Sequence, residues 1–167
     1  MKKLTFSFYC LISLSVVNIG FAQGPPRGGT PASMDLATAK SLTEATVTAA
    51  KAANANVAIS IVDANGDLVY FERMDGAISM AVTSSQGKAR AAILFGIPTK
   101  TAAEAAAAGT ALNAKITPSG AGSSAIAVQQ GGLPIMKDGK IIGGIGVGGS
   151  SPGNDEAFAQ KALDGQK

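Results

Sequence analysis

Two short β-rich runs joined by a turn sequence constrain the fold of this chain more than any other feature. The runs Val57–Val62 and Leu68–Glu72 are rich in β-branched and aromatic residues, which favour strands. Between them lies Asp63-Ala-Asn-Gly-Asp67, in which Asn65-Gly66 supplies the positive φ angles of a tight hairpin turn. We therefore expect an antiparallel hairpin in the middle of the chain.

Further helices and strands are predicted on both sides of this hairpin. Capping residues and alanine-rich runs indicate helices, which we expect from Ser33 or Asp35 to Ala53, from Ala77 to Phe95, from Thr99 or Thr101 to Ala108, and from Asn154 or Asp155 to Leu163. We also expect a strand at Ser124–Gln129, a second hairpin around Lys137–Lys140 and a strand at Gly143–Gly149. This order predicts an α+β layered domain with one antiparallel sheet of about five strands.

The expected strand Gly143–Gly149 carries almost no side chains. Glycine inside a strand often marks a place where another backbone or a ligand approaches closely. Residues 144–149 also satisfy the pattern G-x-G-x-x-G, which binds dinucleotides when it lies within a β-α-β unit. Because Pro152 follows and no such unit is predicted, we favour close packing.

The first 22 residues have the three parts of a secretory signal peptide: a basic start, the apolar run Leu4–Val17, and small residues before Gln23. The run is shorter than the roughly 20 apolar residues of a membrane span. We therefore expect cleavage after Ala22, a periplasmic or secreted protein, and no membrane span after cleavage. A Pro/Gly-rich tether at residues 23–33 then leads into one domain at residues 34–167.

The composition excludes several classes of site. The chain has no histidine, and its one cysteine, Cys10, lies in the expected signal peptide. Ser-His-Asp and Cys-His catalysis and zinc sites built on histidine or cysteine are therefore excluded. Scattered basic residues and 5% aromatics do not suggest a nucleic-acid surface. The pair Ser85 and Lys88 fits S-x-x-K, but the S-D-N and K-T-G partners of that catalytic motif are missing.

A candidate binding cleft begins at Arg73-Met-Asp-Gly76, where an arginine and an aspartate leave a strand beside a glycine. These residues either form a local ion pair that shapes the turn or line a cleft. Lys88 and Arg90 on the following helix would add positive charge to that cleft. Such cationic donors suit the carboxylates of a ligand.

Five sequence blocks, in order, resemble the GlcG/HbpS family, also called the haem-degrading domain family. The blocks are Ala58–Gly66, Phe71–Ala77, Lys88-Ala89, Gly131–Ile135 and Asp138–Val147, and Asp155 stands where the family has an acidic residue opening the last helix. The resemblance covers roughly residues 34–164. It implies a profilin-like α/β/α fold, self-assembly into dimers or larger rings, and frequent secretion.

The resemblance also implies a ligand. Exported members include haem binders, some of which degrade haem slowly with peroxide, whereas other members, encoded with glycolate or diol metabolism, have no settled activity. We therefore expect an exported binding protein for haem or a related tetrapyrrole that forms a homo-oligomer. The alternatives are an enzyme or accessory protein for hydroxy acids or aldehydes, and a structural homo-oligomeric subunit. Whether the protein is an enzyme stays open.

Under this resemblance, the expected ligand-binding residues combine cationic side chains with nearby polar and glycine positions. They are Arg73, Asp75, Lys88, Arg90, Thr99, Gly131 and Gly132. The absence of histidine leaves other donors for iron, of which Met74 is the first choice. The remaining donors are Met80, Met136, Tyr70, a lysine amine, and the hydroxyl of Thr99 or Thr101. Each methionine has the alternative role of filling the core.

Overall fold

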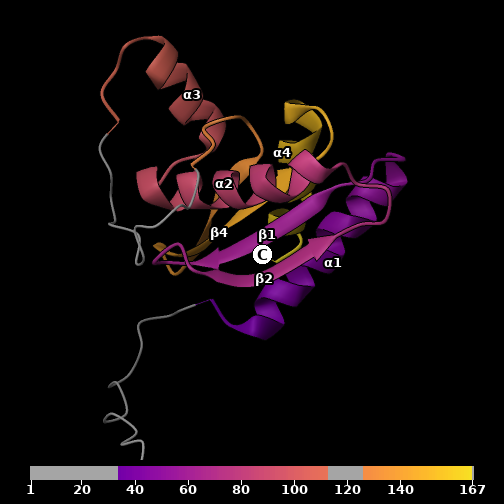
Figure 1. The fold of residues 1–167 in the computed structure, drawn as a ribbon. Helices are drawn as coiled ribbons and strands as arrows, with labels where there is room; N and C mark the ends of the chain where they lie inside the picture. Colours follow the sequence, from indigo (N-terminus) through magenta and orange to yellow (C-terminus); the bar gives the residue numbers. More distant parts are fainter. Residues whose placement is uncertain (1–33, 113–125, 167) are drawn as a thin grey trace, which may run out of the picture.

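The computed structural model describes residues 34–112 and 126–166 (Figure 1). Their elements, in order, are α1 (Leu36–Ala52), β1 (Ala58–Asp63), β2 (Leu68–Arg73), α2 (Ser79–Phe95), α3 (Thr99–Ala107), β3 (Gly132–Lys137), β4 (Lys140–Gly148) and α4 (Pro152–Asp164). The expected signal peptide and tether lie outside the described residues. No helix in the described ranges is long and apolar enough to cross a membrane.

The four strands form one antiparallel sheet in the order β2-β1-β4-β3. This confirms the α+β layered fold and both hairpins, with four strands in the described residues instead of about five. The expected strand at Ser124–Gln129 is wrong for residues 126–129, which form no strand, and its first two residues lie outside the described ranges. Those four residues instead pass over α2, where the Ala127 N–H donates to the Gly87 carbonyl.

The two hairpin turns use different chemistry. In the first, only Gly66 has a positive φ, 85°, so the expectation for Asn65 is wrong. That turn is closed by the Asp63 carboxylate, which accepts hydrogen bonds from the N–H groups of Asn65 and Asp67. In the second turn, Asp138 and Gly139 both have positive φ, as a tight two-residue hairpin requires.

Both faces of the sheet are covered by helices (Figure 1). On one face, Ile59 and Ile61 of β1 pack with Leu42 of α1 and Phe158 of α4 in the main core. On the other face, α2 lies against β1 and β4, and Val62 packs with Ile93. Alternate residues of β1 therefore serve two cores, and burial on both faces explains why four of its six residues are apolar.

The glycines of β4 allow α2 to approach the sheet backbone to backbone. A Cβ atom at Gly144 would lie 2.7 Å from the Ala89 carbonyl oxygen, and one at Gly146 would meet backbone atoms of Ser85 and Ala89. The expectation of close packing at this strand is confirmed. Because α2 of the same chain covers these glycines, they are not a free surface for contact between subunits.

The helix ends differ from expectation by a few residues. The cap of α4 is Ser151, whose hydroxyl accepts from the Asn154 N–H, so the expected start at Asn154 or Asp155 is too late. Pro152 fits the first turn of that helix, where its missing N–H has no partner to lose. The helix α2 begins at Ser79 instead of Ala77 but ends at Phe95 as expected, and the φ of 68° at the next residue, Gly96, suits a glycine cap.

Candidate ligand-binding site

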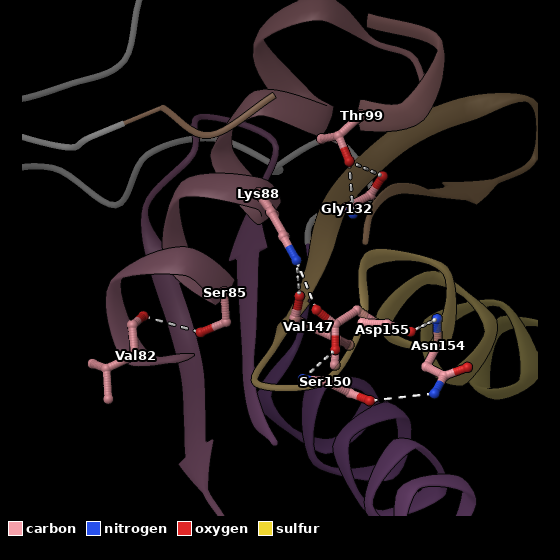
Figure 2. A network of polar contacts seen from close by, with 10 residues as sticks. Val82, Ser85, Lys88, Thr99, Gly132, Val147, Ser150, Asn154 and Asp155 are labelled. Carbon is pink, nitrogen blue, oxygen red and sulfur yellow. Dashed lines mark hydrogen bonds and ion pairs between the residues drawn. The ribbon is translucent and has the colours of Figure 1, made fainter. Parts of the chain in front are cut away.

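A buried ion pair joins α2 to α4 at the end of β4 (Figure 2). The Lys88 Nζ atom donates to Asp155 Oδ2 at 2.8 Å and to the Val147 carbonyl at 2.9 Å, and both charged side chains are 2% exposed. Asp155 Oδ1 accepts from the Ser150 N–H at 3.0 Å. Each charge is therefore compensated by an opposite charge and by a backbone group.

Gly131 and Gly132 lie directly against this pair. A Cβ atom at Gly131 would lie 2.9 Å from Lys88 Nζ, and one at Gly132 would meet the Lys88 carbonyl. The Thr99 hydroxyl accepts a hydrogen bond from the Gly132 N–H at 2.9 Å and donates one to the Gly132 carbonyl at 3.3 Å. The structure thus brings together four of the expected site residues, Lys88, Thr99, Gly131 and Gly132, and adds Asp155. Figure 2 shows all of these except Gly131 with labels.

The burial and pairing of Lys88 make its expected role as a hydrogen-bond donor to a ligand more demanding. Its ammonium group is buried and already has two acceptors. A ligand carboxylate would have to compete with Asp155 for that ammonium and to enter a closely packed region. Ligand binding by Lys88 stays a prediction, whereas its part in joining two helices is visible in the contacts.

The other expected residues lie elsewhere. Arg73, Met74 and Asp75 line a pocket of about 340 Å³, together with Val47, Lys51, Asn56 and Glu72. The guanidinium of Arg73 donates through Nε and Nη2 to the Ala77 carbonyl, at 3.1 and 2.6 Å. Arg73 therefore shapes the turn through a backbone acceptor. Arg90 is half-buried on α2 and does not line this pocket.

A larger pocket of about 490 Å³ lies along β3, between α1 and α4. We call it the β3 pocket. Its apolar walls are formed by Leu42, Pro98, Leu133, Pro134, Ile135, Ile142 and Leu163. Its polar lining consists of Asp35, Thr38, Lys137, Gln160 and Gln166, and Met136 adds a thioether. Apart from Met136, sequence reasoning missed this site because its walls come from separate segments that only the fold brings together.

The β3 pocket carries charges of both signs. Hydrogen bonds from the Thr38 N–H at 2.7 Å and the Thr38 hydroxyl at 2.9 Å lower the pKa of Asp35 below its usual 3.8, and the charge of Lys137 lowers it further. Asp35 is therefore an anion at neutral pH, close enough to Lys137 to respond to its charge. Among the described residues, no group of three or more Asp, Glu, His or Cys could hold a metal ion.

Comparisons with known proteins agree with this fold. An uncharacterized 15.0 kDa protein of the dhaT-dhaS intergenic region of Citrobacter freundii is 32% identical over 134 residues, which cover 80% of this chain and 92% of that relative. The structure of an HbpS double mutant of Streptomyces reticuli matches with a TM-score of 0.72 and 26% identity, over 86% of this chain and 95% of that chain. The PduOC:heme complex matches with a TM-score of 0.69 and 27% identity, over 79% and 94%.

The family model described as haem degrading protein HbpS-like matches residues 34–164. This range contains both hairpins, the buried Lys88–Asp155 pair and every lining residue of the β3 pocket except Gln166. The resemblance found in the sequence blocks is therefore confirmed over nearly the whole described region, and the chain belongs to the HbpS-like family.

Proposed function

We propose that this protein binds haem or a related tetrapyrrole in the β3 pocket. The observation that carries the proposal is a pocket of about 490 Å³ with apolar walls, one cationic side chain and one thioether. Small-molecule sites typically occupy about 300–1,000 Å³ and are mostly apolar with a few polar groups. The similarity to PduOC, whose structure is a haem complex, supports the same ligand class.

The residues of the pocket fit the parts of haem. Leucine, isoleucine and proline side chains can cover the ring, Lys137 can pair with a propionate, and Met136 offers a sulfur atom to iron. The chain has no histidine, so the commonest protein ligand of haem iron is not available to it. Bound haem would supply an iron centre for ligand binding or redox chemistry.

A haem titration with a matched pair of variants tests this proposal. Leu163 lines the pocket and is half-buried, whereas Leu68 lies on β2, outside the pocket, and is 45% exposed. We expect a saturable Soret change for the parent. Leu163→Gln should weaken binding by about tenfold, the equivalent of ~1.4 kcal/mol of lost apolar contact, and Leu68→Gln should have no effect. A parent without a saturable Soret change would refute the proposal.

Haem degradation is a separate proposal, supported by family membership. We propose that the protein accelerates the slow breakdown of haem by peroxide. The haem-loaded protein and free haem should be mixed with the same peroxide concentration, and the Soret band should be followed. Faster loss of the band in the protein is expected, and equal or slower loss would contradict the proposal.

We further propose that residues 1–22 direct export, on the strength of the basic, apolar and small-residue pattern. The N-terminus of the exported protein is expected at Gln23. Recovery of the protein in the cytoplasm with an intact N-terminus would contradict this.

Self-association is also proposed. Ile78 and Met80, at the start of α2, are 58% and 71% exposed and offer apolar contact area. Light scattering should give a mass above that of one subunit, and Met80→Glu should lower it. A single-subunit mass across micromolar concentrations would contradict the proposal.

A further inference from the structure

We infer that the thioether of Met136 is the iron ligand in the β3 pocket. The inference rests on the proposed haem function and adds to it the atom that contacts the metal. It follows from the position of the five methionines, four of which lie in the described residues.

Met136 combines exposure with a place in the apolar pocket. It lies on β3, its side chain is 54% exposed, and it lines the β3 pocket. The register of β3 with β4 shifts between Ile135 and Met136. Such irregularities redirect side chains from the regular alternation of a strand. The side chain of Met136 is therefore not a filler of the core.

The other described methionines lack this combination. Met34 is 6% exposed and belongs to the main core, where it approaches Gly143. Met74, the first choice from the sequence, packs against the main core and lines the smaller pocket, where four of the seven lining residues are charged. Met80 is 71% exposed on α2 and lines neither pocket.

The oxygen donors considered from the sequence are also less suitable. The Thr99 hydroxyl is buried and bonded to Gly132. Tyr70 packs against the main core and lies outside the β3 pocket. Asp35 does line that pocket, but its carboxylate already accepts two hydrogen bonds from Thr38. Among residues 34–112 and 126–166, no hydrogen bond to the thioether of Met136 is found, and a thioether is a known axial ligand type for haem iron.

The neighbouring Lys137 fits the same mode of binding. It lines the β3 pocket, and its charge acts on Asp35 at the pocket edge. If the iron of a bound haem were coordinated by Met136, Lys137 would be available to pair with a propionate. Ring burial and this charge should bind any tetrapyrrole dicarboxylate, whereas Met136 should add affinity only when iron is present.

The test compares haem with metal-free protoporphyrin IX, because the two share ring and propionates. Both should be titrated into the parent, Met136→Leu and the control Leu68→Met, which alters an exposed side chain outside the pocket. We expect Met136→Leu to weaken haem by about tenfold and to change its visible spectrum, while protoporphyrin IX binds within about twofold of the parent. Leu68→Met should leave the affinity for both ligands unchanged.

The outcomes separate this inference from the proposed function. If the parent binds both porphyrins, and Met136→Leu keeps the haem affinity and spectrum of the parent, then Met136 is not the ligand and the haem proposal stands. If the parent binds neither porphyrin, the proposed function itself falls. Met136→His provides a gain-of-ligand control, since an imidazole at this position should tighten haem binding and leave protoporphyrin IX unchanged.

Discussion

Lys88 and Asp155 are 67 residues apart in the sequence, yet Lys88 Nζ lies 2.8 Å from Asp155 Oδ2 in the interior. Both side chains are 2% exposed. Removing two charges from water is costly, so such a pair contributes little net stability compared with well-packed apolar residues. Removing one partner is different, because it leaves the other charge buried and alone.

We therefore predict that Lys88→Met destabilises the protein by about 3–5 kcal/mol, measured as the free energy of unfolding in urea. Asp155→Leu should cost a similar amount, because the ammonium then loses its counter-charge. The double variant Lys88→Met, Asp155→Leu should recover much of the loss, since no unpaired charge remains. Equal urea concentrations at the midpoint of unfolding for the parent and Lys88→Met would show that the pair does not hold α2 and α4 together.

The local chemistry of the turns made much of the sheet predictable. The β-rich runs around Asp63–Asp67, and the turn at Asp138-Gly139, specify two hairpins from neighbouring residues alone. The glycines of β4 predicted a close approach, because only a residue without a side chain permits it. The element that approaches, α2, was not predictable, because α2 and β4 are distant in the sequence and meet only in the folded chain.

The candidate site was less predictable than the fold. Lys88 was expected to be an accessible donor because its positive charge is visible in the sequence. Its burial and its pairing with Asp155 cannot be seen in the sequence. The β3 pocket combines wall residues as distant as Leu42 and Leu163. Individually these residues are indistinguishable from ordinary core positions. Their shared cavity depends on how α1, α4 and β3 come together in the fold, which no short pattern encodes.

The contact between α2 and β4 gives a second prediction. Gly146→Ala would place a Cβ against the backbone of Ser85 and Ala89, which cannot move aside as a flexible side chain can. We expect a loss of about 1–3 kcal/mol or more in the free energy of unfolding. Gly153→Ala is the matched control, because a Cβ there meets nothing within 4 Å. A similar melting temperature for both variants would contradict the backbone contact.

Thr99 gives a third prediction, because its hydroxyl bonds both backbone groups of Gly132 at the outer edge of β3. Thr99→Val keeps the shape of the side chain but leaves the buried N–H and carbonyl of Gly132 without this partner. The cost should be about 1–3 kcal/mol in urea unfolding. Thr99→Ser keeps the hydroxyl and should cost less than Thr99→Val. The reverse order would show that the methyl group, and not the hydrogen bond, is what matters here.

The fourth prediction concerns acid. Hydrogen bonds from Thr38 hold the pKa of Asp35 below its usual 3.8 in the folded protein. A carboxyl whose pKa is lower in the folded state stabilises that state above its unfolded pKa and loses this effect as the pH falls through the folded pKa. Asp35→Asn keeps a side-chain oxygen to cap α1 but does not titrate. The parent should therefore melt at a higher temperature than Asp35→Asn at neutral pH, where the carboxylate also favours the helix N-terminus.

That advantage should disappear once the pH is well below 3.8, because Asp35 is then protonated and its hydrogen bonds from Thr38 weaken. Melting temperatures of both proteins, measured by circular dichroism over this pH range, give the comparison directly. Other carboxyl groups titrate in both proteins and cancel in the difference. A difference that stays constant with pH would mean that the charge of Asp35 does not contribute to the cap, and that its oxygen atoms act only as neutral acceptors.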